Sequence, residues 1–132
     1  HPKHIGLFFG FDDELAHLVE AGSDMFLMPS RYEPCGLNQM YSMRYGTVPI
    51  VRATGGLDDT VEDHAANGKG TGFKFEKYDA RELLKTIQRA VRVFQQPEEW
   101  KKLMRNGMTK DFSWEHSARE YANLYREVLK QA

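Results

Sequence analysis

Short, continuously apolar runs alternate with helical patterns in the first half of the chain. The runs cover residues 5–9, 25–28 and 48–51, and each ends in residues typical of turns. Four or five apolar residues without polar alternation indicate strands that are buried on both faces. Residues 72–75 form a weaker fourth candidate. This feature restricts the chain to folds with a central, covered sheet.

Two amphipathic patterns lie between the runs. Asp12 and Asp13 suit the start of a helix, and Gly22 suits its end. Apolar residues at helical spacing begin again at Leu37, and Gly46 marks the stop. The order strand, helix, strand, helix, strand predicts a parallel sheet with right-handed crossovers. We therefore predict an α/β fold with about four strands and helices on both faces.

The second half of the chain, from about residue 79, predicts three helices. Asp79 suits the start of the first helix, and Pro97 ends it and opens the second, which runs to about residue 108. Ser113 begins the third, which extends to about Lys130. Residues 64–71 suggest a loop. No internal repeat or linker divides residues 1–132, so we expect a single domain.

Composition excludes several classes of protein. The 132 residues carry 18 Lys and Arg against 19 Asp and Glu, a net charge of -1, so nothing indicates a nucleic-acid partner. No apolar run is long enough to span a membrane. The single cysteine forms no internal disulfide, and the five histidines lack metal-site spacing, so we expect neither a metal nor a cofactor. Because the chain begins with His1, we expect a processed chain or a piece of a longer one.

Residues 29–38, Pro-Ser-Arg-Tyr-Glu-Pro-Cys-Gly-Leu-Asn, follow a predicted strand and precede a predicted helix. Ligands of open parallel sheets bind beyond the carboxyl ends of the strands. The following helix offers unpaired amides that suit an anion such as a pyrophosphate, and Gly36 permits close approach. Cys35 has no histidine arranged to activate it, so we expect a structural or backbone role for it.

Glu33 admits two interpretations. Its carboxylate could cap the helix or pair with Arg31, which is a purely structural role. Alternatively, it could accept hydrogen bonds from sugar hydroxyls or stabilise positive charge that develops at an anomeric carbon.

Residues 54–57, Thr-Gly-Gly-Leu, form a second loop at the same predicted edge. Paired glycines allow a backbone to approach a ligand, although a plain tight turn is the simpler explanation. The chain contains neither a P-loop nor a Gly-x-Gly-x-x-Gly motif.

Residues 23–39 and 44–57, together with Asp59-Thr60-Val61, resemble the signature segments of bacterial glycogen synthases and plant starch synthases. Residues 111–114 resemble the motif that precedes the last helix in that family. The resemblance implies a retaining glucosyltransferase that moves glucose from ADP-glucose onto the non-reducing end of an α-1,4-glucan. It also implies two Rossmann-like domains facing a cleft, of which this chain is the later part of the C-terminal one.

The resemblance assigns roles to individual residues. Glu33 matches the active-site glutamate near the donor glucose, and Phe11 matches an aromatic residue that stacks on adenine. The broader group of retaining transferases often has a second glutamate eight positions after the first. Here that position is Tyr41, as it is in glycogen and starch synthases. The remaining matches are loop residues at the donor glucose, its phosphates and the cleft: Cys35, Gly36, Leu37, Asn38, Thr54, Gly55 and Gly56. Asn38 departs from the family, where threonine is frequent at this position.

The resemblance also implies groups that this sequence lacks. The family's phosphate-binding Arg and Lys and its N-terminal domain precede the matched region, so we expect little or no activity from the chain alone. Residues 5–9 would be the third strand in the order 3-2-1-4-5-6, separated from the fourth by two strands outside the sequence. We therefore expect a rearranged sheet or a homo-oligomer that covers the open edge.

Two other functions compete with the synthase. One is a non-catalytic nucleotide- or glucan-binding fragment, and the other is a related transferase that uses a different sugar nucleotide. The resemblance implies cytoplasm for a bacterial protein and the plastid for a plant protein.

Overall fold

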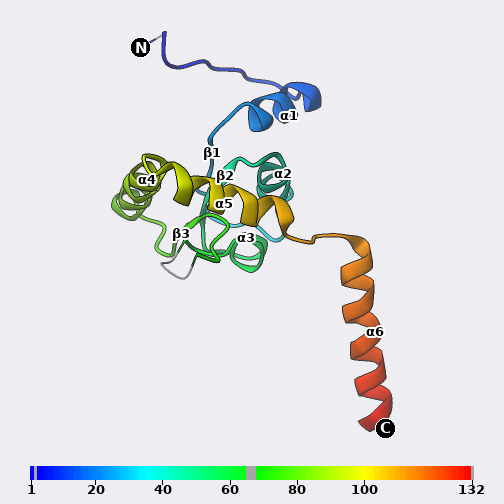
Figure 1. The fold of residues 1–132 in the computed structure, drawn as a ribbon. Coiled ribbons are helices and arrows are strands. Elements are labelled where there is room, and N and C mark those ends of the chain that lie inside the picture. Colours follow the sequence, from blue (N-terminus) through cyan, green and yellow to red (C-terminus); the bar gives the residue numbers. More distant parts are fainter. Residues whose placement is uncertain (2, 65–67, 132) are drawn as a thin grey trace.

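The computed structural model describes residues 1, 3–64 and 68–131. Its centre is a parallel sheet of three strands in the order β1-β2-β3 (Figure 1). The strands are β1 (Met25–Met28), β2 (Val48–Arg52) and β3 (Phe73–Phe75). Met25 pairs with Val48, and Ile50 pairs with Phe73. The predicted α/β class and parallel sheet are confirmed, with three strands in the described residues rather than about four.

Six helices occur in the described residues, and the predicted helices are confirmed within one or two positions. Their bounds are α1 Asp13–Ala21, α2 Asn38–Tyr45, α3 Gly56–Thr60, α4 Ala80–Phe94, α5 Pro97–Thr109 and α6 Trp114–Gln131. Asp12 caps α1 by accepting the Leu15 amide, and Asp79 caps α4. Residues 65–67 of the loop expected at 64–71 lie outside the described residues.

Helices cover both faces of the sheet because β2 is apolar on both sides. Ile50 faces one layer, where it packs in a cluster with Ala90 of α4 and Leu103 of α5. Val51 faces the other layer, where it packs in a cluster with Met43 of α2 and Leu57 of α3, as the strand's alternation requires.

The predicted first strand at residues 5–9 is wrong. The segment forms no regular structure in this chain, and Leu7, Phe8 and Phe9 are exposed. A strand needs a neighbour to pair its backbone amides and carbonyls, and no described strand lies beside this segment. The expected rearranged sheet is wrong as well, because β1 pairs only with β2 and its outer edge stays open among the described residues. The expected homo-oligomer stays a prediction.

The two ends of the chain extend from the sheet and its covering helices (Figure 1). The N-terminal segment leads into α1, which packs on α2. At the other end, α6 projects away, with Trp114, Tyr121 and Leu129 exposed. In the described residues, no helix is both long and apolar enough to cross a membrane.

Candidate active site at the carboxyl edge of the sheet

Three loops gather where the strands end. The loop after β1 carries residues 29–37, the loop after β2 carries residues 53–55, and the loop after β3 carries residues 76–79. Because the strands are parallel and in register from Met28 through Val51 to Lys74, their carboxyl ends lie together. The first two loops are those predicted to form the site, so the structure brings them to one edge.

Arg52, at the end of β2, ties the three loops together. Its Nε donates to the carbonyl oxygen of Ser30 at 2.7 Å, and its Nη2 donates to the carbonyl of Arg31. Its Nη1 donates to the Glu76 carbonyl at 3.4 Å, and the guanidinium lies 5.7 Å from the ring centroid of Tyr78. A planar guanidinium with several donors can hold loops from neighbouring strands in one arrangement.

Gly55 and Gly56 allow the second loop to lie directly against the first. A Cβ on Gly55 would stand 2.1 Å from the Glu33 carbonyl oxygen, and a Cβ on Gly56 would stand 1.8 Å from the Cys35 carbonyl oxygen. The Gly56 amide donates to the Glu33 carbonyl at 3.2 Å. Gly55 also has φ +48, in the left-handed region that favours glycine. The close approach that we expected for a ligand is thus made, in this structure, by the backbone of residues 33–35.

The side chain of Gln39 in α2 holds the first loop through hydrogen bonds. The side chain is 0% exposed, and its Nε2 donates to the carbonyls of Cys35 at 3.2 Å and Gly36 at 3.0 Å. The same nitrogen lies 3.0 Å from Oγ1 of Thr60, which in turn donates to the Gly56 carbonyl. Buried amide donors of this kind fix the peptide planes that they bind. Gln39 and Thr60 therefore join the two predicted loops.

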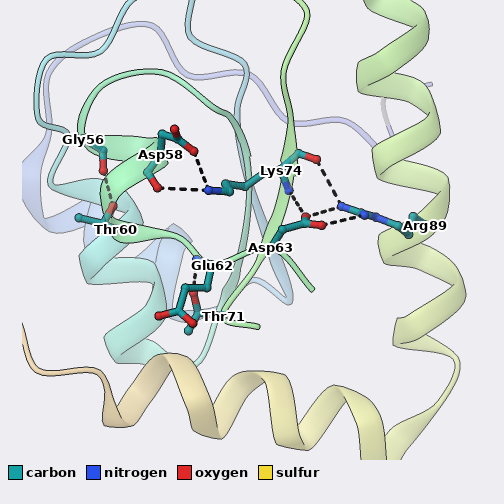
Figure 2. A network of polar contacts seen from close by, with 8 residues as sticks. All are labelled: Gly56, Asp58, Thr60, Glu62, Asp63, Thr71, Lys74 and Arg89. Atoms are coloured by element: carbon teal, nitrogen blue, oxygen red, sulfur yellow. Dashed lines mark hydrogen bonds and ion pairs between the residues drawn. The ribbon is translucent and has the colours of Figure 1, made fainter. Parts of the chain in front are cut away.

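A second set of contacts holds α3 against β3 (Figure 2). Lys74 Nζ lies 2.6 Å from Oδ1 of Asp58, and the Lys74 amide donates to Asp63 Oδ1 at 2.6 Å. Arg89 of α4 donates to Oδ2 of the same Asp63 carboxylate at 2.9 Å. The helix that follows the Gly55–Gly56 turn is therefore anchored through β3 to α4.

The carboxylate of Glu33 has no partner among the described residues. Its side chain is half-buried, and none of their hydrogen bonds or ion pairs uses it. Helix α2 begins after Leu37 without a side-chain cap, so Glu33 does not cap it, and Glu33 forms no ion pair with Arg31. Both structural roles that the sequence left open are therefore absent, and the carboxylate is available to a ligand.

The other predicted residues of the first loop lie around the start of α2. Cys35, Leu37 and Asn38 are exposed, and Gly36 has φ +72, which suits glycine. The uncapped amides at the start of α2 give this end of the loop a partial positive charge. A phosphate group beside residues 36–38 would find complementary donors.

Phe11 and Thr54 differ in their relation to this edge. Thr54 is half-buried in the second loop, next to the Gly55–Gly56 turn. Phe11 precedes α1 and is 97% exposed, so its ring contacts almost nothing in this chain. The structure therefore does not bring Phe11 together with the loops.

A groove of about 670 Å³ lies between α2 and the segment before α6. It meets the predicted site only at Leu37; its lining also includes Met40, Tyr41, Lys110 and Trp114. The groove is therefore a neighbour of the loops rather than the site itself. In the described part of the chain, no cluster of three or more His, Cys, Asp or Glu side chains could hold a metal ion.

Sequence reasoning missed Arg52, Gln39 and Thr60, which position the loops. Gln39 offered little signal, because a polar residue in a helix is usually exposed, and its burial is seen only in the folded chain. Arg52 offered less, because a charged residue at the end of a buried strand is common and its carbonyl partners cannot be deduced from spacing.

Comparisons with known proteins agree with this geometry. Residues 3–107 match the family of glycosyl transferases group 1. The chain belongs to this glycosyltransferase family. Its similarity extends to bacterial glycogen synthases, at 56% identity over 129 residues for Koribacter versatilis and 54% over 132 residues for Methylococcus capsulatus. Each alignment covers 97% of this chain but 27% of the relative, so the chain spans about a quarter of their length.

Solved structures show the same fold relationship. The catalytic domain of starch synthase IV from Arabidopsis thaliana, bound to ADP and acarbose, superposes with a TM-score of 0.78 and 40% identity, covering 89% of this chain and 25% of that one. Sucrose-phosphate synthase from Thermosynechococcus elongatus gives a TM-score of 0.69 and 28% identity, covering 99% of this chain and 32% of that one. The predicted resemblance to glycogen and starch synthases is confirmed.

Proposed function

We propose that the chain is the donor side of an ADP-glucose-dependent α-1,4-glucan synthase. The observation that carries the proposal is the free carboxylate of Glu33, held on a braced loop at the carboxyl edge, beside the uncapped start of α2. The relatives are named glycogen synthase, and the starch synthase structure was obtained with ADP and acarbose. A nucleotide diphosphate and a sugar are the ligands that this edge suits.

The roles of the loop follow from charge. The amides near Gly36 and Asn38 face the position proposed for the diphosphate, where negative charge grows as ADP departs. Glu33 stabilises the positive charge that develops at the anomeric carbon of the glucose. The bond from that carbon to the phosphate oxygen breaks, the bond to the acceptor oxygen forms, and the acceptor proton passes to the leaving phosphate. The resemblance to the family implies this front-face route. A double displacement would instead need a second carboxylate about 5 Å from the first.

A second domain is required by this proposal. One helix start supplies only part of the stabilisation that departing ADP needs, and a cleft with one wall cannot exclude water. We place the missing cations and the acceptor groups on an N-terminal domain of the intact protein. The relatives suggest the cytoplasm for a bacterial protein and the plastid for a plant protein.

Glucose transfer to glycogen, measured with the intact protein and with the 132-residue chain, tests the proposal. We expect turnover with ADP-glucose from the intact protein and little or none from the chain alone. The similarity to sucrose-phosphate synthase favours one other candidate, a transferase with a different donor or acceptor. A clear preference of the intact protein for UDP-glucose, or no transfer to glycogen, would contradict the synthase and favour that candidate.

A further inference from the structure

A small pocket opens beside the donor loops, at the same edge of the sheet. Its volume is about 310 Å³, at the lower end of the range for small-molecule sites. It is lined by Pro29 after β1, by Phe75 at the end of β3, and by Tyr78, Asp79, Ala80 and Leu83 at the start of α4. Pro29, Tyr78 and Asp79 come from two of the three loops at this edge, but none of the lining residues is among those predicted to bind the donor.

The chemistry of the lining is that of a sugar site. Phe75 is buried and Leu83 half-buried, and both give the pocket an apolar floor. Tyr78 remains 63% exposed and presents an aromatic ring with a hydroxyl at its tip. A pyranose ring has an apolar face of C–H groups and a rim of hydroxyls, so it matches an apolar, aromatic surface with a polar edge.

Asp79 supplies the polar edge. Both hydrogen bonds that its carboxylate accepts among the described residues, from the amides of Arg81 and Glu82, go to Oδ1. Oδ2 can therefore accept from a sugar hydroxyl. Asp79 is also the one charged residue of the lining.

The aromatic ring is held in place by the residue that braces the donor loops. The Arg52 guanidinium lies over the Tyr78 ring, 5.7 Å from its centroid. The same guanidinium donates to the carbonyls of Ser30 and Arg31. A cation against the ring limits its motion before a ligand arrives, which reduces the entropy lost on binding.

From these observations we propose that the Tyr78 pocket binds one glucosyl unit of an α-1,4-glucan. This inference rests on the proposed function and adds to it a glucan contact on the donor side of the cleft. The pocket lies beside the donor loops, so a chain seated there passes close to the reacting glucose.

Titration of the 132-residue chain with maltoheptaose tests the inference, followed by calorimetry and by backbone amide shifts. We expect saturable binding with shifts confined to residues around 29 and 75–83. Tyr78→Ala should weaken binding about tenfold or more, whereas Tyr78→Phe should retain most of it. Tyr121→Ala is the matched control, because Tyr121 is 61% exposed but lies on α6, and it should leave the affinity unchanged.

A second variant guards against misfolding of the first. Ala80→Trp fills the pocket without removing any side chain, and it should abolish binding while the circular dichroism spectrum stays unchanged. No saturable binding by the unaltered chain, shifts elsewhere, or an equal loss from Tyr121→Ala would overturn the inference. Displacement of maltoheptaose from this pocket by ADP would overturn it too, because the pocket would then bind the nucleobase.

The two proposals fail in different ways. If the intact protein transfers glucose to glycogen but maltoheptaose does not bind at Tyr78, the glucan pocket is contradicted and the synthase proposal stands. If maltoheptaose binds at Tyr78 but no glucose is transferred from ADP-glucose, the synthase proposal is contradicted and the chain is a glucan-binding protein.

Discussion

The α-carbon of Gly56 faces the carbonyl oxygen of Cys35 so closely that a Cβ there would lie 1.8 Å from that oxygen. This contact joins the two loops of the candidate site through their backbones. The glycine pair is therefore a structural requirement of the site, whether or not it also touches a ligand.

Gly56→Ala should separate the two loops. The added methyl group cannot be accommodated without backbone movement, so we expect the free energy of unfolding to fall by about 2–4 kcal/mol. Urea denaturation measures the change. Gly6→Ala is the control, because nothing lies within 4 Å of a Cβ at Gly6, and it should shift stability by about 0.5 kcal/mol or less. Equal effects from the two variants would show that the contact is unimportant.

Gln39→Leu should loosen the first loop. Leucine fills much of the space but leaves the partly buried carbonyls of Cys35 and Gly36 without their donor. We expect a loss of about 1–3 kcal/mol in the free energy of unfolding. Because Cys35 is the single cysteine and is exposed, the rate of thiol labelling reports on the loop directly, and it should change.

The control for Gln39→Leu is Gln88→Leu, at an exposed position of α4. It should change the free energy of unfolding by no more than about 0.5 kcal/mol and leave the labelling rate of Cys35 unchanged. An unchanged labelling rate in Gln39→Leu would mean that the amide does not fix the loop.

The sequence was sufficient for much of this fold. The runs at 25–28 and 48–51, the caps Asp12 and Asp79, and Pro97 each act locally, so strands and helix ends followed from them. The segment at 5–9 did not form a strand, because strand formation depends on a neighbour that apolar composition cannot provide.

The candidate site divides in the same way. Glu33 and the glycines could be found because turns and helix starts depend on residues that are adjacent in the sequence. The contacts of Arg52 with Ser30 and Glu76 could not, because they join positions more than twenty residues apart, and only the folded sheet brings them together.

Glu20 should make stability depend on pH. It is 3% exposed, and burial raises its pKa above the ordinary value of 4.5, although the nearby His17 and a hydrogen bond from Ser42 partly offset this. Between these two pKa values the folded chain keeps a proton that the unfolded chain has released. The free energy of unfolding therefore falls as pH rises through that window and stays lower above it.

Glu20→Gln removes this effect. We expect the variant to be more stable than the unaltered chain at about pH 7, by up to about 1 kcal/mol, with the difference shrinking towards about pH 4. Thermal denaturation at the two pH values measures it. Glu120→Gln, at an exposed site on α6, should show no such trend. If the stability of Glu20→Gln relative to the unaltered chain were lower at about pH 7 than at about pH 4, the direction of the pKa shift assigned to Glu20 would be wrong.

Glucose transfer by the Glu33→Gln variant of the intact protein is the decisive measurement for the proposed role of this carboxylate. We expect turnover from ADP-glucose to glycogen to fall by about 100-fold or more, because a neutral amide does not stabilise positive charge at the anomeric carbon. Glu98→Gln, on an exposed face of α5, should leave turnover unchanged. Turnover of Glu33→Gln within about threefold of the unaltered protein, a difference of less than about 1 kcal/mol in the barrier, would show that Glu33 does not stabilise this charge.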